Sequence, residues 1–368
     1  MMNETDFKRI FNLPFTEAED FFKNKLNIPT SAWDELTGAA HAKGFMSAGA
    51  YNADLLADLR KMVDKAIAGG MDIREFRKQF IPLVDRYGWQ LKGGGPAWRS
   101  DLIWRTNTNS AYQAGRWQQF EDARIDYLKY VHNDSVMHPR PKHVALNGKI
   151  LPRTDPFWSV CYPPNGFGCR CRAVAAREQE YNEGDNFRPQ GWQDAPDKGW
   201  DYNVGLESKQ SFLGLTNKFE SLPADIAREW MQQWVNEPAF ARFVEGKMEG
   251  DFPVAVLRPE DVAALGTTKQ TVWLSADSLA KNKGETLRSP GHPDLTLEDY
   301  RMIPEIVDAG EVYRQKETNL IYLLRGGTLY RASIKRTEAA DGNYLLSLFK
   351  TSETKAAKEV VTRMERIR

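Results

Sequence analysis

HPRPKHVALNGKILPRTDPFWSVCYPPNGFGCRC, residues 138–171, is the stretch that decides how the rest of this chain is organised. It lies in a loop-rich segment, residues 132–172, that holds six prolines and three glycines. Loops longer than about 12–15 residues are uncommon inside compact domains unless something orders them. We therefore expect an interaction other than a hydrophobic core to hold this segment in place.

All three cysteines of the chain and three of its five histidines fall in or beside this stretch. They are Cys161, Cys169, Cys171, His132, His138 and His143. Structural zinc sites use four Cys or His ligands, and bound metal can order a segment that has little core of its own. We predict a zinc site whose ligands are His143, Cys161, Cys169 and Cys171.

The cysteine spacing leaves other interpretations open. Cys169 and Cys171 are separated by one residue, which is not a usual chelating spacing. Buried structural thiols with hydrogen-bonded histidines are the first alternative, and a zinc-dependent hydrolase centred on His143 and the cysteines is the weakest. A catalytic cysteine is disfavoured, because the sequence pairs no nucleophile with a base.

Composition excludes several classes of protein. The 368 residues carry 50 Lys+Arg and 50 Asp+Glu, so a uniformly basic protein that coats nucleic acid is excluded. Three cysteines exclude a disulfide scaffold and indicate a reducing compartment. No apolar run approaches a membrane span, and residues 1–10 do not resemble a secretory signal. The net charge of zero is a sum of segments with opposite net charges. These are −1 for residues 1–90, +5 for 91–180, −6 for 181–251 and +2 for 252–368.

The N-terminal part is predicted to be helical. Apolar residues recur at helical spacing over residues 53–67, and Asp72 is suited to cap a second helix. A long helix is expected from about Trp98 to Ala123, after a glycine-rich loop at residues 93–96. Its central polar residues, 106–110, indicate a helix start, a satisfied polar face or a hydrogen-bonding seam to a partner.

The rest of the chain is predicted to be a connector followed by an α+β domain. Residues 181–206 have the composition of an acidic linker, and residues 221–245 are expected to form a helix capped by Ser221 or Asp225. Strands are expected at 254–257, 271–274, 311–314, 319–324, 328–335 and 344–349, with a helix after Thr296 and another over 353–366. Helices followed by an antiparallel meander indicate the α+β class.

Three motifs resemble the phage Mu F-like minor head proteins. They are Arg140–Lys149 (RPKHVALNGK), Asp155–Trp158 (DPFW) and Tyr162–Cys171 (YPPNGFGCRC), together with Arg105-Thr106 upstream. Related head-morphogenesis proteins place a CxxC pair where this chain has Arg140 and His143. The resemblance implies a minor capsid protein in the virion, inside the capsid or near the portal, and in the host cytoplasm during assembly. It implies portal and other head proteins as partners. The +5 segment fits contact with DNA inside the capsid or with an acidic protein, and it equally fits an ordinary solvated face.

The C-terminal strands raise a second hypothesis. Arg331, Ser333 and Lys335 alternate along one predicted strand, so they share a face that could hold a phosphodiester, although many such faces are simply solvated. Residues 252–368 resemble phage-encoded nucleases of the barnase, EndoU, colicin and RelE-like class. That resemblance implies metal-independent RNA cleavage without a cofactor, with RNA as substrate. The implied residues are His292 as acid/base, Arg331 and Lys335 on phosphate, and Ser275 and Thr351 as hydrogen-bond donors.

The sequence as a whole predicts a multidomain α+β protein. Residues 1–180 would be a helical head-protein domain with its motif core at about 50–180, residues 181–251 an acidic connector, and residues 252–368 a nuclease-like domain with a meander sheet. The leading functional hypothesis is a minor head protein that carries a ribonuclease effector. The alternative is a purely structural head protein with a catalytically inactive C-terminal binding module.

Overall fold

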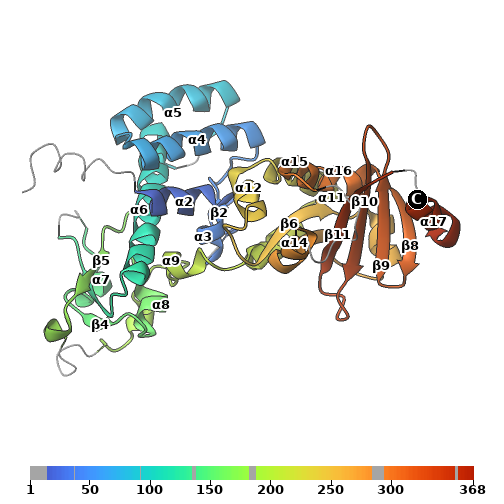
Figure 1. Cartoon of the computed structure of the whole chain (residues 1–368). Coiled ribbons are helices and arrows are strands. Elements are labelled where there is room, and N and C mark those ends of the chain that lie inside the picture. The colour runs from blue at the N-terminus through green and yellow to red at the C-terminus, as the bar shows by residue number, and fades with distance from the viewer. Residues whose placement is uncertain are drawn as a thin grey trace, which may run out of the picture. The chain divides into compact units, whose positions relative to one another are not determined.

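The computed structural model describes residues 15–36, 38–91, 93–134, 138–181, 188–283, 294–352 and 355–368. The chain divides into two compact units, Met1–Lys209 and Gln210–Arg368. It combines helices with a seven-stranded and a three-stranded sheet, in agreement with the predicted mixture of both element types (Figure 1). No helix among the described residues is long and apolar enough to cross a membrane.

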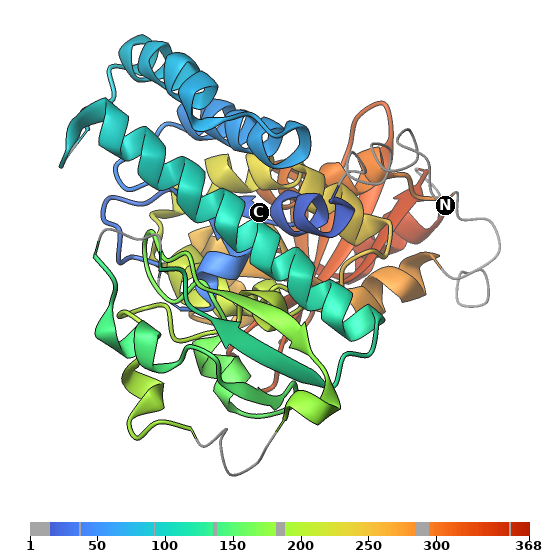
Figure 2. The same cartoon turned by 90° about the vertical axis from the view of Figure 1, so that its left-hand side faces the viewer.

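The first unit is built around one long helix, α6 (Gly95–Asp122). Helices α2 (Thr16–Lys23), α4 (Ala53–Gly69) and α5 (Ile73–Tyr87) all pack against it (Figure 2). The predicted cap of α5 is confirmed, since the Asp72 carboxylate accepts from the backbone N–H groups of Arg74 and Glu75. Helix α4 starts after Asn52, whose side chain accepts from Leu55 N–H, and stops at Gly70 in the left-handed conformation (φ 65°). The short elements β1 (Leu26–Asn27), α3 (Ala40–Lys43) and β2 (Gly44–Phe45) complete this part.

The loop-rich segment folds onto α6 as a small antiparallel sheet with short helices. The strand order is β4-β3-β5, with β3 (Tyr127–Val131) in the centre. The other elements are β4 (Ile150–Pro152), β5 (Arg172–Ala176), α7 (Pro141–Ala145), α8 (Phe157–Cys161), two 3-10 turns (Glu178–Glu180 and Trp192–Asp194) and α9 (Val204–Glu207). Trp117 of α6 meets the ring of Tyr162 edge-on at 4.9 Å, and both side chains are buried. The segment thus has a partial core on α6, which its proline and glycine content did not reveal.

The second unit contains the seven-stranded sheet, in the order β12-β8-β9-β10-β11-β7-β6. Strands β8 to β11 are each antiparallel to the next, whereas β11 and β7 are parallel. The strands are β6 (Asp251–Val256), β7 (Thr271–Ser275), β8 (Glu311–Lys316), β9 (Asn319–Leu324), β10 (Leu329–Arg336), β11 (Asn343–Thr351) and β12 (Glu365–Arg366). All six strands predicted for this part of the chain are therefore present: β9 has the predicted ends, and the other five have ends shifted by one to three residues.

The helices of this unit are short. They are α10 (Thr216–Ser221), α11 (Ala224–Trp234), α12 (Pro238–Val244), α13 (Pro259–Leu265), α14 (Ala276–Lys283), α15 (Leu297–Arg301), α16 (Ile303–Ala309) and α17 (Lys355–Arg363), with a 3-10 turn at Phe212–Leu215. Helix α16 packs on β6, β9 and β10, while Val360 of α17 packs on Tyr313, Ile321 and Leu323. A helix follows Thr296 as expected, and Thr296 caps it in a reciprocal capping box with Asp299.

Two sequence-based boundaries differ from the observed ones. Residues 221–245 form separate helices rather than one, because Pro223 and Pro238 each precede or open a new helix. The observed division falls between residues 209 and 210, inside the segment 181–251 that was expected to connect two domains. Trp200 is buried in the first unit and Trp230 in the second, so the described part of that segment belongs to the two cores.

Candidate metal centre

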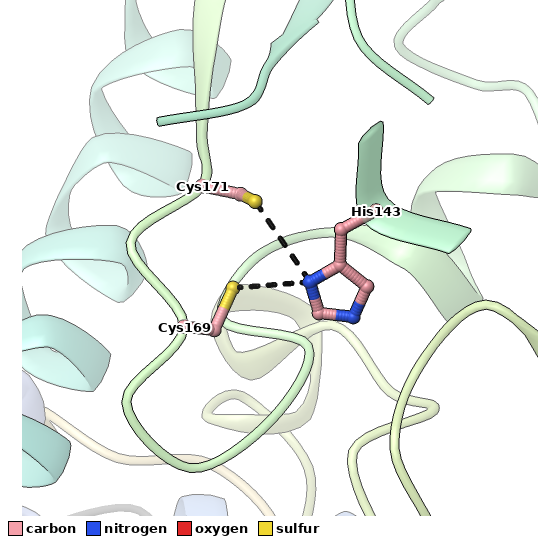
Figure 3. A group of neighbouring side chains, drawn as sticks. All are labelled: His143, Cys169 and Cys171. Carbon is pink, nitrogen blue, oxygen red and sulfur yellow. Dashed lines mark hydrogen bonds between the residues drawn. The ribbon is translucent and has the colours of Figure 1, made fainter. Parts of the chain in front are cut away.

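Three side chains with metal-binding donors converge in the loop-rich segment: His143, Cys169 and Cys171 (Figure 3). His143 lies on α7, and Cys171 immediately precedes β5. Cys169 follows a turn in which its N–H bonds the carbonyl of Gly166 and Gly168 has a φ of 68°, a conformation that favours glycine. This turn brings both thiols toward the same imidazole.

The donor atoms are close and buried. His143 Nδ1 lies 3.7 Å from the Sγ atom of Cys169 and 3.9 Å from that of Cys171, and the three donor atoms all lie within 4.8 Å of one another. None of the three residues is more than 5% exposed. A buried histidine facing two thiols is a donor set that could hold a metal ion, and zinc accepts both ligand types.

The pKa values of the Cys169 and Cys171 thiols are shifted in opposite directions. The thiol of Cys169 donates to Cys171, and together with the backbone N–H of Asn133 it lowers the pKa of Cys171 to about 7 against the opposing effect of burial. The same hydrogen bond and burial raise the pKa of the Cys169 thiol. One thiolate is thus available near neutral pH, and the thiolate is the form that binds metals.

Polar side chains of α6 donate hydrogen bonds to the backbone of the cysteine loop, which is the segment that carries Cys169 and Cys171. Asn109 donates from Nδ2 to the carbonyl of Cys169 at 2.8 Å, and Gln113 donates from Nε2 to the carbonyl of Cys171 at 3.4 Å. The hydroxyl of Tyr162 donates to the carbonyl of Gln113 at 2.8 Å. Of the central polar residues, Asn109 therefore bonds to another segment of the same chain, whereas Asn107 and Thr108 donate to carbonyls of α6 itself.

Cys161 does not join the other predicted ligands. It lies on α8, where its Sγ donates to the carbonyl of Trp192 at 3.2 Å, and burial raises its pKa to about 12. His132, which was noticed but not included in the predicted ligand set, contacts the group instead: its Nδ1 lies 3.3 Å from the Sγ of Cys171. His138 is exposed. The sequence signal for His132 was its position one residue after a central strand.

A cleft opens beside the group. Its volume is about 530 Å³, and Cys169 lines it together with Asn109 and Gln113 of α6 and the exposed Arg170 and Arg172. The buried donors therefore lie next to a solvent-connected space through which an ion could enter.

The residues proposed for a nuclease site lie on several strands of the second unit. Arg331 and Lys335 lie on β10, Ser275 ends β7 and Thr351 ends β11, while His292 falls outside the described residues. The pairing of β9 with β10 has no register shift, so Arg331 and Lys335 do share a face.

Local contacts engage three of these side chains. Arg331 is half-buried with its guanidinium over the ring of Phe349, 6.0 Å from the centroid, and burial lowers its pKa. The Ser275 hydroxyl accepts from the N–H of Ser278 in the first turn of α14, and Thr351 donates to the carbonyl of Ser352. Lys335 is exposed. Asp251 is the cross-strand neighbour of Ser275, and Tyr344 is that of Lys335.

Comparison with known proteins identifies the segment that carries the cysteine and histidine group. Residues 57–174 match the family described as Phage Mu protein F like protein. That range contains His132, His143, Cys169 and Cys171, and it confirms the family resemblance carried by the sequence motifs. The family model covers less than half of the chain.

Two full-length relatives extend the similarity. The chain is 28% identical to the "Mu-like prophage FluMu F protein" of Haemophilus influenzae, over 86% of this chain and 93% of the relative. It is 29% identical to the "Putative capsid assembly protein F" of Escherichia phage Mu, over 86% of this chain and 85% of the relative. The uncovered share is smaller than either structural unit, so both matches include residues of both units. No solved structure gives a significant match.

Proposed function

We propose that this chain is a phage capsid assembly protein that works with other proteins of the phage head. The observation that carries the proposal is the similarity, over 86% of this chain, to the "Putative capsid assembly protein F" of phage Mu. The family match to residues 57–174 supports the same role. Because the similarity includes residues of both units, the assembly role belongs to the whole chain.

More specifically, we propose that the chain is a minor head protein that binds the portal and stays in the virion. The exposed Arg170 and Arg172, beside the cleft on the first unit, support a contact with an acidic surface of a head protein. DNA inside the capsid is the other anionic partner that such residues would accept, and it remains a sequence-based hypothesis.

Deletion of the gene in the phage that carries it tests this role. We expect lysis to proceed while the yield of infectious particles collapses, and a plasmid copy of the full chain to restore it. Electron microscopy of the lysate would show defective heads, and mass spectrometry of purified wild-type particles would detect the chain. Normal particle yield without the gene, together with its absence from particles, would refute the proposal.

The ribonuclease hypothesis for the second unit stays a prediction from sequence resemblance. Its structural support is limited to Arg331 and Lys335 on one face of β10. The test is to incubate the full chain with RNA in EDTA, beside Lys335→Ala and His292→Ala variants. Cleavage lost in both variants would support an enzyme, and an intact substrate with the wild-type chain would reject it.

We also propose that the group of His143, Cys169 and Cys171 binds a structural zinc ion. Their closeness and burial, and the hydrogen bonds that hold the cysteine loop to α6, support this assignment. A zinc ion there would tie α7 to the start of β5 and order the loop-rich segment. Elemental analysis of the full chain purified without added metal should find about one zinc per chain, and a metal-free, folded protein would refute the proposal.

A further inference from the structure

The zinc proposal leaves one coordination position open. Structural zinc sites in proteins are almost always tetrahedral with four protein ligands. His143, Cys169 and Cys171 supply three. We propose that His132 supplies the fourth, in place of Cys161, so that the centre is a Cys₂His₂ site. This inference rests on the zinc proposal above.

The nitrogen–sulfur distances that join His132 to Cys171, and His143 to both cysteines, are compatible with such a site. With Zn–S near 2.3 Å and Zn–N near 2.0–2.1 Å, tetrahedral geometry separates a nitrogen and a sulfur ligand by about 3.6 Å. The observed nitrogen–sulfur separations are 3.3 Å for His132 with Cys171, and 3.7 and 3.9 Å for His143 with Cys169 and Cys171. His132 approaches from the Cys171 side; it does not lie within 4.8 Å of all three other donor atoms, so its side chain would have to move toward them when the ion binds.

The surroundings of His132 suit a ligand. Only 7% of the residue is exposed, and its backbone N–H donates to the Asn147 side chain at 2.9 Å, which holds it at the end of β3. Its Nε2 has no hydrogen-bond partner among the described residues, and a carboxylate oxygen of Asp134 lies 4.0 Å away. Histidines that ligate metal through one nitrogen usually donate the other N–H to such a carboxylate, so Asp134 would orient the ring.

The competing donors are placed elsewhere. Cys161 is held on α8 by the hydrogen bond that its Sγ donates to the carbonyl of Trp192 at 3.2 Å. His138 is exposed and has no recorded contact with either thiol among the described residues. With His132 included, one ion would join the end of β3, helix α7 and the start of β5. That connection would explain how a proline-rich segment keeps a defined fold.

Cobalt substitution of the full chain tests the assignment. Co²⁺ in a tetrahedral thiolate site gives intense visible d–d bands and a thiolate-to-metal charge-transfer band that grows with each thiolate. The metal-free chain would be titrated with Co²⁺ and then with Zn²⁺ in competition. The variants are His132→Ala and Cys161→Ser, with His138→Ala as the matched control.

We expect His132→Ala to weaken Zn²⁺ binding by more than the roughly 10–100-fold that loss of an outer-shell partner costs, and to reduce the d–d bands. Cys161→Ser and His138→Ala should match the wild type. The His132→Cys variant distinguishes loss of a ligand from a folding defect. It should bind Co²⁺ with a charge-transfer band of three thiolates instead of two. Wild-type binding in His132→Ala, with loss in Cys161→Ser, would overturn the assignment but leave the zinc proposal standing. No metal uptake by the wild type would overturn both.

Discussion

We expect the charge of the Lys25 side chain to control the stability of the first unit. The substitution Lys25→Met, which removes this charge, tests that expectation. Lys25 is 4% exposed, and its ammonium donates to the carbonyl of His41 at 2.7 Å. Burial, and then the charge of Arg60, lower the pKa of Lys25 from 10.5 to about 7. Arg60 is itself buried, with hydrogen bonds to the carbonyls of Phe22 and Lys23, so it cannot turn away.

Proton linkage determines whether the free energy of unfolding rises or falls with pH. Below pH 7 the Lys25 amine is protonated in the folded and the unfolded chain, and its burial cost is present in full. Between pH 7 and 10.5 the unfolded chain keeps the proton that the folded chain has lost, so the free energy of unfolding rises with pH. At about 1.4 kcal/mol per pKa unit the whole rise is at most about 5 kcal/mol. Lys25→Met removes this cost but leaves the His41 carbonyl without its donor, which costs about 1–3 kcal/mol.

We therefore expect Lys25→Met to raise the free energy of unfolding at pH 7 by about 1–4 kcal/mol and to flatten its rise toward pH 10. Hydrogen exchange of peptides from α2 and α4, corrected for intrinsic rates, measures this in the full chain. The control is Lys23→Met, because the Lys23 side chain is partly exposed and forms an ion pair with Glu19. A wild-type stability that is constant from pH 7 to 9 would refute the reasoning. It would mean that water in the cavity of about 90 Å³ beside Lys25 hydrates the ammonium.

Two further predictions concern close packing and a buried ion pair. Gly205→Ala would place a Cβ 2.3 Å from a tryptophan side chain of α6, so we expect a loss of about 1–3 kcal/mol in hydrogen-exchange stability of α6, whereas Gly214→Ala, with open space, should change little. Arg368→Ala would strip the fully buried Asp261 of its ion-pair partner and destabilise β8 by about 3–5 kcal/mol in the same assay. Arg366→Ala, at an exposed position, should stay within about 0.5 kcal/mol of wild type, and equal effects of the two arginines would contradict the assignment.

Elements specified by local chemistry were predictable from the sequence. Asp72 caps the helix that it was expected to cap, because a side-chain oxygen two or three residues ahead of free N–H groups acts locally. Strand β9 has the predicted ends because apolar residues and flanking turns mark it. The start of α6 was less predictable: glycine-rich residues 93–96 were expected to be a loop, yet the helix begins at Gly95 with a proline in its first turn.

Composition was a poor guide where tertiary contacts decide the outcome. The acidic, glycine-rich segment 181–206 has the composition of a linker, but Trp200 and Tyr202 within it are buried in the first unit. Net charge does not report such burial, because a few large aromatic side chains contribute most of the apolar area that a short segment can bury.

The sequence by itself determined which donors are available to this protein and the family its central segment resembles. Three cysteines and three histidines lie within 40 positions, and no spacing rule selects among them. The tertiary structure decided the selection: α8 holds Cys161 against the Trp192 carbonyl, whereas the end of β3 brings His132 to Cys171. Donors meet through strand pairing and helix packing, and these depend on contacts between residues that are far apart in the chain.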